Sequence, residues 1–399
     1  MDGERAGVAQ TEPVEHLYVH VPFCLRRCPY CDFAVSVRSS PPWEAYAQQV
    51  VAEARARLGA RGPWPWKTVF LGGGTPSLMP GDVLAAMLQD LVAGGAQPEI
   101  TLEVNPETVG EEALRGWAAA GVTRLSFGAQ SFDDHALRTL GRQHTGAQAR
   151  AAIARAAAAQ AFALSVDLIF GVPSTVPEIV SSDIAWLATS GWVTHLSLYE
   201  LTYEARTSMT QALRRGKLRA WEDGALREVH EAALAALRGE GWERYEVSNF
   251  RRDPGAGCRH NLAIWEGDTY LGVGVGAVST LRDAMGGWHR RTNTHHVARY
   301  LAASPDALAD GPDAQHEALS CQERWSERWI MALRQPRPWG WRENASVDPA
   351  GVAKLVARWE ALGWVRVLDD DALCPTEEGL FFSDQMGLDI VTLLPDESR

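Results

Sequence analysis

The chain has 399 residues, a length that suits one large α/β unit with a smaller unit attached. Its hydrophobic content of 46% is enough for a packed core and argues against a disordered chain. The 38 basic and 50 acidic side chains give a net charge of −12, which argues against nucleic acid as a partner and against a polybasic membrane anchor. No apolar run of about 18 residues predicts an integral membrane segment, and no secretory signal is recognised, so we expect a cytoplasmic protein.

Six β-type runs alternate with helical segments between residues 16 and 240. The strands are predicted at 16–21, 68–73, 99–105, 124–131, 163–170 and 195–201, and the helices near 41–60, 80–94, 110–120, 145–160, 176–190 and 221–240. Such alternation predicts parallel strands joined by crossover helices. Six units are two fewer than a closed barrel needs, so we expect an α/β fold with a partial, TIM-like (β/α)6 barrel.

The pattern changes after about residue 240. The runs at 245–250 and 270–280 predict an extra sheet-like piece with tight turns, and residues 315–399 are typical of two helices followed by a two-stranded end. We therefore expect a flexible N-terminus (1–15), the barrel (16–240), a mixed extension (241–310) and a small winged-helix-like α+β domain (311–399). The last unit is either a packing appendage or a binding unit.

Three of the six cysteines, Cys24, Cys28 and Cys31, lie within eight residues, directly after the first predicted strand. Six cysteines are too few for a disulfide scaffold. Three clustered thiolates can each bind one iron of a 4Fe–4S cluster and leave the fourth iron open for a ligand. The alternative is a zinc site whose fourth ligand is His20 or a distant residue.

Polar residues stand near the ends of the later predicted strands. The glycine-rich string GGGTPS (72–77) follows the second strand and allows its N–H groups to turn toward a polar ligand. Glu103 and Asp167 lie inside apolar strands, where a carboxylate is costly unless it is paired. Their partner is either an internal cation, Arg142 or Arg124, or a ligand.

The Cys-x3-Cys-x2-Cys loop after the first strand, with an aromatic residue (Tyr30) before the last cysteine, resembles the radical S-adenosylmethionine (SAM) superfamily. In that family the open iron binds the amino and carboxylate groups of SAM. By this resemblance the SAM contacts correspond to Tyr18, Tyr30, Gly73, Gly74, Thr75, Glu103, Gln130, Arg142, Asp167 and Leu201.

The strings YEVSNF (245–250), CRHNLAIW (258–265) and YLGVGVGAVS (270–279) resemble a segment shared by oxygen-independent coproporphyrinogen III oxidases and HemW-type haem chaperones. The oxidases have a fourth cysteine where this chain has Phe33, and a longer N-terminal extension. Both differences favour the chaperone branch.

The chaperone branch carries a His-Asn-x-x-Tyr-Trp string. The chain has His260, Asn261 and Trp265, but Ile264 replaces the tyrosine. His260 is therefore either a haem ligand or the centre of a hydrogen-bond network, and Cys258 is an alternative thiolate ligand or an ordinary buried cysteine.

The resemblance implies a protein that binds a 4Fe–4S cluster, SAM and haem, and passes haem to an unknown apo-haemoprotein. It also implies an electron donor to the cluster and is compatible with a homodimer. The alternatives are a SAM-dependent coproporphyrinogen III oxidase, a related radical SAM methyltransferase or haem-degrading protein, and a zinc-stabilised barrel of unrelated function.

Overall fold

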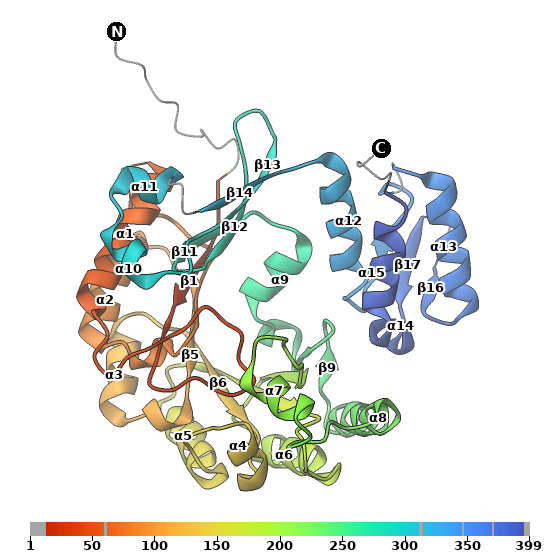
Figure 1. Cartoon of the computed structure of the whole chain (residues 1–399), viewed down its shortest axis with the longest axis horizontal. Helices are drawn as coiled ribbons and strands as arrows, with labels where there is room; N and C mark the ends of the chain where they lie inside the picture. The colour runs from red at the N-terminus through yellow and green to blue at the C-terminus, as the bar shows by residue number, and fades with distance from the viewer. Residues whose placement is uncertain (1–12, 60–61, 311–313, 345–346, 369–370, 395–399) are drawn as a thin grey trace.

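The computed structural model describes residues 13–59, 62–310, 314–344, 347–368 and 371–394. Most of the predicted flexible N-terminus (1–15) therefore lies outside the described residues. Figure 1 shows an arc of helices outside a curved sheet, with a second, smaller unit to one side.

A nine-stranded sheet forms the centre of the described molecule. In spatial order its strands are β11 (Leu271–Gly274), β1 (His16–Val21), β4 (Thr68–Gly73), β5 (Glu99–Val104), β6 (Arg124–Gln130), β7 (Ala163–Phe170), β8 (His195–Glu200), β10 (Asn249–Arg251) and β9 (Glu243–Arg244). Neighbours from β11 to β8 are parallel, whereas β10 and β9 are antiparallel. The prediction of an α/β partial barrel is confirmed.

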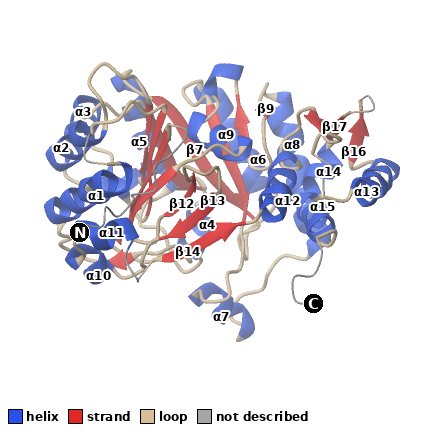
Figure 2. Ribbon diagram, turned by 90° about the horizontal axis from the view of Figure 1, so that it is seen from above, coloured by secondary structure: helices blue, strands red, loops and turns tan. Residues whose placement is uncertain are grey.

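The six predicted β/α units are present, and each predicted helix lies within a few residues of its expected place. The helices are α1 (Trp43–Leu58), α2 (Gly81–Leu91), α3 (Glu111–Ala119), α5 (Gly146–Ala159), α6 (Glu178–Ser190) and α8 (Asp223–Gly239), with the short α4 (Asp134–Thr139) and α7 (Ser208–Arg214) between them. Thr145 and Gln148 form a capping box that fixes the start of α5. Figure 2 shows α1, α2 and α3 on the outer side of the sheet.

The segment after residue 240 forms an extra sheet, as expected, but it also extends the main sheet. Its strands β11 and β10 join the main sheet, β11 beside β1 and β10 beside β8. The rest forms α9 (Arg259–Glu266), α10 (Val297–Ala302), α11 (Pro305–Asp310) and an antiparallel sheet of β12 (Val278–Arg282), β13 (Trp288–Thr292) and β14 (Gln315–Leu319). The pairing of β11 with β1 links strands that are more than 250 residues apart, and no local sequence pattern predicts it.

The C-terminal residues pack around a core of their own, which includes the fully buried Trp329 and Trp359. Its elements are α12 (Cys321–Ala332), β15 (Trp339–Gly340), α13 (Pro349–Ala361), β16 (Val365–Val367), β17 (Ala372–Pro375), α14 (Glu377–Phe381) and α15 (Ser383–Val391). The two helices and the paired strands β16 and β17 were expected, but α14, α15 and the third strand of this sheet, β15, were not. Among the described residues, no helix is long and apolar enough to cross a membrane.

Candidate functional site

Successive side chains of a strand point to opposite faces of the sheet. In this sheet, polar side chains occupy several of the inward-facing positions. On β1, the side chains of Leu17, Val19 and Val21 join the apolar core. Tyr18 and His20 lie on the opposite, inner face, where the Tyr18 hydroxyl is 3.0 Å from His20 Nδ1. The carboxyl end of this strand leads directly into the cysteine loop, as the sequence predicted.

The three clustered cysteines are free thiols on one loop, which begins with the two-residue strand β2 (Phe23–Cys24) paired with β3 (Ser36–Val37). The Thr75 hydroxyl donates to Cys24 Sγ over 3.6 Å, and the Arg142 guanidinium donates to Cys28 Sγ over 3.6 Å. Burial raises the pKa of the Cys24 and Cys31 thiols. Hydrogen bonds from a hydroxyl and a guanidinium stabilise the thiolate form in which cysteine binds metal.

The geometry disfavours the zinc alternative. Within the described part of the chain, no three Cys, His, Asp or Glu side chains converge as ligands of one metal ion would. Both ring nitrogens of His20 are already engaged, Nδ1 with the Tyr18 hydroxyl and Nε2 with the Ala34 carbonyl oxygen at 3.0 Å. A 4Fe–4S cluster requires only that each thiolate reach a different iron atom, so the three sulfurs need not converge on one point.

The glycine-rich turn after β4 packs tightly against the cysteine loop. The Gly74 and Thr75 N–H groups donate to the carbonyl oxygens of Val21 and Phe23, and a Cβ at Gly74 would lie 2.8 Å from the Phe23 oxygen. The Gly73 N–H donates to Glu103 Oε2 over 3.0 Å. The amides that we expected to face a ligand are thus engaged within the protein, and glycine is required here for close packing of two loops.

Glu103 and Asp167 both reach the inner face, from β5 and β7, and neither forms an ion pair with a described residue. Asp167 lies 3.4 Å from the Ser126 hydroxyl. Burial, together with the charge of Asp167, raises the pKa of Glu103 to about 7, and burial raises the pKa of Asp167 to about 6. The two carboxylates are therefore arranged so that a cationic ligand would stabilise their charged forms.

The two arginines considered as internal partners are engaged elsewhere. Arg124 pairs with Glu99 over 3.0 Å. Arg142 donates to Asn105 Oδ1 over 2.6 Å and to the Gly128 carbonyl oxygen over 2.9 Å, while its Nε has no partner. Neither arginine therefore forms an ion pair with Glu103 or Asp167, although the charge of Arg142 partly offsets the rise in the pKa of Asp167.

The other predicted contacts surround this group. Gln130 ends β6 with a φ of 66°, beside a register shift in the β6–β7 pairing, and its side-chain amide has no hydrogen-bond partner among the described residues. Tyr30 packs against an apolar cluster that contains Leu201, and burial raises the pKa of Tyr30.

Sequence reasoning missed the residues that connect the site. Asn105 Oδ1 accepts a hydrogen bond from Arg142, and Asn105 Nδ2 donates one to Thr75 Oγ1 over 3.4 Å. Asn105 therefore links the two side chains that contact Cys28 and Cys24. The period of two along β5 was the available signal, because it places Asn105 on the same face as Glu103.

The helix α9 carries the histidine string and lies on the concave side of the arc of helices (Figure 1), against the first residues of β1, β4 and β5. His260 is 5% exposed, and its Nδ1 is 2.8 Å from Thr68 Oγ1. Its ring packs on Phe70, with centroids 5.3 Å apart. Burial lowers the pKa of His260 to about 3 and raises that of Cys258 to about 12, so the imidazole is neutral and Cys258 is a protonated, buried thiol.

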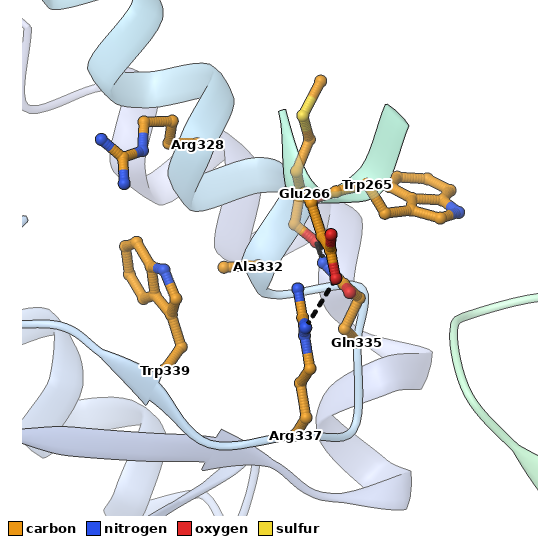
Figure 3. Close-up of a pocket in the computed structure, with 8 residues that line it drawn as sticks. Trp265, Glu266, Arg328, Ala332, Gln335, Arg337 and Trp339 are labelled. Carbon is orange, nitrogen blue, oxygen red and sulfur yellow. Dashed lines mark hydrogen bonds and ion pairs between the residues drawn. The ribbon is translucent and has the colours of Figure 1, made fainter. Parts of the chain in front are cut away.

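The last residues of α9 are fixed to the C-terminal unit (Figure 3). Gln335 Nε2 donates to the Trp265 carbonyl oxygen over 3.0 Å, and Arg337 pairs with Glu266 over 3.0 Å. The pocket between them has a volume of about 50 Å³, which is too small for a cofactor-sized ligand. Trp265 therefore belongs to a contact between units.

Comparison with known proteins identifies the family. The sequence model of a protein family described as "Radical SAM superfamily" matches residues 18–182 of the chain. The chain is 38% identical over 327 residues to "Heme chaperone HemW" of Mycobacterium tuberculosis, which covers 80% of this chain and 81% of the relative. The chain belongs to the HemW-type branch of the radical SAM superfamily.

Two further likenesses agree with this HemW-type assignment. "Radical S-adenosyl methionine domain-containing protein 1, mitochondrial" of Mus musculus is 37% identical over 298 residues, or 73% of this chain and 65% of that relative. The solved structure of coproporphyrinogen III oxidase (HemN) from Escherichia coli covers 97% of this chain and 92% of its own, with 21% identity and a TM-score of 0.79. This last likeness shows a shared fold.

Membership in this HemW-type branch implies a 4Fe–4S cluster and SAM. The residues fit both groups. Three free thiols stand on the single loop that follows β1, and the buried carboxylates Glu103 and Asp167 form no ion pair with a described residue. The Nε of Arg142 is also left without a hydrogen-bond partner.

Proposed function

We propose that this protein is a haem chaperone of the HemW type, which binds haem and transfers it to an acceptor haemoprotein. The observation that carries the proposal is the identity of 38% to a relative named as a haem chaperone, over 80% of the chain. Phe33, which is 62% exposed on the cysteine loop, supports it, because the oxidase branch has a cysteine there. The likeness to the oxidase rests on the shared fold.

In this proposal Cys24, Cys28 and Cys31 hold the cluster, and SAM binds beside it on the inner face. When bound, the two groups together supply one-electron chemistry. Thr75 and Arg142 donate hydrogen bonds to the cysteine sulfurs, which stabilises negative charge on them. Glu103 and Asp167 supply negative charge toward a cationic ligand, and Tyr18, Tyr30, Gly73, Gly74, Gln130 and Leu201 complete the proposed SAM surface.

We assign haem ligation to His260. Its neutral imidazole is the form that binds iron. Cys258 is the weaker candidate, because a thiol whose pKa is raised to about 12 must lose a proton in a buried position before it can bind metal.

Anaerobic reconstitution tests the cluster. We expect about four iron and four sulfide per chain in the wild type, and loss of both in Cys28→Ala. Cys321→Ala is the matched control, because Cys321 is exposed on α12, outside the loop. Tightly bound zinc, or iron that survives Cys28→Ala, would contradict the cluster assignment.

Haem titration, run beside a coproporphyrinogen III assay, tests chaperone against oxidase. We expect a saturable Soret band, transfer of haem to an apo-haemoprotein, and no conversion of coproporphyrinogen III. Conversion without a saturable haem band would establish the oxidase alternative. A haem spectrum that is unchanged in His260→Ala would remove His260 as the ligand.

A further inference from the structure

The loop that carries the three clustered cysteines exposes large apolar side chains. Leu25, Phe33 and Val37 are 59%, 62% and 54% exposed. Leu25 directly follows Cys24, and Cys24 is the partner of Val37 in the β2–β3 pairing, so these apolar residues lie close to a cysteine. Several exposed apolar side chains on one short segment are typical of a surface that contacts a partner.

The same loop also carries positive charge. Residues 25–38 contain one aspartate and three arginines: Arg26, Arg27 and Arg38. All three arginines are exposed, and none forms an ion pair with a described residue. Arg27 Nε donates to the Cys31 carbonyl oxygen over 3.3 Å. A guanidinium group is therefore held against the backbone of one of the clustered cysteines.

The segment around α7 extends this positive charge. Residues 204–219 contain one acidic side chain, Glu204, and five exposed basic ones: Arg206, Arg214, Arg215, Lys217 and Arg219. Figure 2 shows α7 standing out from the body of the molecule.

Two contacts join this segment to the cysteine loop. Arg206 pairs with Asp32 over 3.1 Å, and the Met209 N–H donates to the Pro29 carbonyl oxygen over 2.9 Å. Residues 25–38 and 204–219 therefore form one surface, which we call the loop–α7 surface.

The charge of the loop–α7 surface is opposite to that of the chain. The surface has eight basic and two acidic side chains, whereas the whole chain has 38 basic and 50 acidic ones. An acidic partner is attracted to this surface and repelled by the rest of the molecule, which orients it during the encounter. Aromatic and arginine side chains are also the residues that protein interfaces favour.

The position of the surface indicates the kind of acidic partner. A protein docked here lies beside Cys24, Cys28 and Cys31, which hold the cluster in the proposed function. Electron transfer becomes much slower with distance, so a protein that reduces the cluster must dock close to these cysteines. Electron-transfer partners also bind through small, transient interfaces, and a surface built from one loop and one short helix is of that kind.

We propose that the loop–α7 surface docks an acidic one-electron carrier protein that reduces the cluster. The carrier is oxidised by one electron, the cluster is reduced by one electron, and no bond forms or breaks. The proposal rests on the cluster of the proposed function and does not depend on haem transfer.

Calorimetric titration of the reconstituted full chain tests the charge complementarity. The probes are a plant-type 2Fe–2S ferredoxin, which is an acidic carrier, and cytochrome c, which is a basic one. We expect ferredoxin to bind at about 0.01 M ionic strength and to bind more weakly at about 0.15 M, because the screening length falls from about 30 Å to about 8 Å. Cytochrome c should not bind. Absent or salt-independent binding of ferredoxin, or tighter binding of cytochrome c, would overturn the proposal.

Substitutions on the surface locate the contact. Reversing two exposed charges together, in Arg26→Glu/Lys217→Glu, should weaken ferredoxin binding about tenfold or more at low salt. Phe33→Ser should cost about tenfold through lost apolar contact, with the salt dependence retained. The controls are Arg366→Glu on β16 and Leu388→Ser on α15, two exposed positions in the C-terminal unit. Equal affinities in the surface variants and the controls would show that docking occurs elsewhere.

Cluster reduction, followed by its visible absorption, separates docking from damage to the loop. Photoreduced 5-deazariboflavin is small and uncharged, so it should reduce the cluster equally fast in the wild type and in Arg26→Glu/Lys217→Glu. With reduced ferredoxin we expect the variant to be about tenfold slower. If both reductants become slower together, the substitutions disturb the loop and the docking proposal fails. A wild type without iron would instead contradict the cluster assignment, whereas the binding titration with ferredoxin would still test the surface.

A second copy of the chain is the other protein that could occupy this surface. Sedimentation velocity of the wild type and Phe33→Ser distinguishes the two occupants. A dimer that is lost in Phe33→Ser, with ferredoxin binding unchanged, would assign the surface to the dimer contact and refute the carrier. A monomer, or a dimer that Phe33→Ser leaves intact, supports the carrier when ferredoxin binding falls.

Discussion

If Glu103 and Asp167 contact SAM as proposed, we expect the affinity for SAM to depend on pH. Burial and the charge of Asp167 raise the pKa of Glu103 to about 7. A group with this pKa is about one-tenth ionised at pH 6 and about nine-tenths ionised at pH 8. If SAM binds only when Glu103 is ionised, its affinity increases about tenfold from pH 6 to pH 8, which is about 1.4 kcal/mol of binding free energy. Asp167, with a pKa raised to about 6, adds a smaller increase in the same direction.

Calorimetric titration of the reconstituted protein with SAM at pH 6, 7 and 8 measures this effect. Glu103→Gln is the control, because it keeps the size of the side chain but cannot ionise. The amino group of SAM also titrates in this range, but its contribution is the same for both proteins. We therefore expect the wild type to gain about tenfold more affinity than Glu103→Gln between pH 6 and pH 8. Parallel pH profiles would refute the reasoning.

Three further substitutions test packing and burial. Gly74→Ala places a Cβ 2.8 Å from a backbone oxygen of the cysteine loop, so we expect less iron after reconstitution; Gly94→Ala, which has open space around it, should keep the full iron content. Glu246 is 1% exposed, and burial raises its pKa to about 7, so the folded protein binds a proton that the unfolded chain releases above about pH 4.5. The free energy of unfolding therefore falls as pH rises from about 4.5 to about 7. Glu246→Gln should remove about 3 kcal/mol of this pH dependence in urea unfolding; equal slopes would contradict it. Trp329→Ala, at a fully buried indole, should cost about 3–5 kcal/mol in urea unfolding, and an unchanged midpoint would show that the C-terminal core is not organised around it.

The barrel was predictable because its signals are local. The run HLSLYEL (195–201) and its five counterparts are short β-type runs that alternate with helical segments, which is the pattern of parallel strands joined by crossover helices. In α2 the large apolar residues recur at spacings of three and four, and all five of them are buried: Val83, Leu84, Met87, Leu88 and Leu91. The position of the cysteine loop followed from the first strand alone.

The connections within the site were not predictable in this way, because they join distant segments. Asn105 belongs to the site because it forms hydrogen bonds with Thr75 and Arg142, which lie on other loops. His260 forms a hydrogen bond with Thr68, which is 192 residues away in the chain. Even the glycine-rich turn had an ambiguous signal, since close packing and ligand binding both require glycine, and only the acceptors of the N–H groups separate the two.

Strand β1 relates the two proposed ligand sites to each other. His16, Tyr18 and His20 lie on its inner face, and the strand rises about 3.3 Å per residue, so His16 and His20 are separated by about 13 Å. The first contacts Thr68, which also contacts His260, and the last contacts the Ala34 carbonyl oxygen on the cysteine loop. Tyr18 lies between them, against the rings of both His20 and His260. Residues that are about 7–10 Å or more apart and share no partner usually make additive contributions, so Cys28→Ala and His260→Ala should have additive effects on the free energy of haem binding. A double variant that departs from additivity would show that cluster and haem ligand are coupled, and Tyr18→Phe, which removes the hydroxyl bonded to His20, would then test whether β1 carries the coupling.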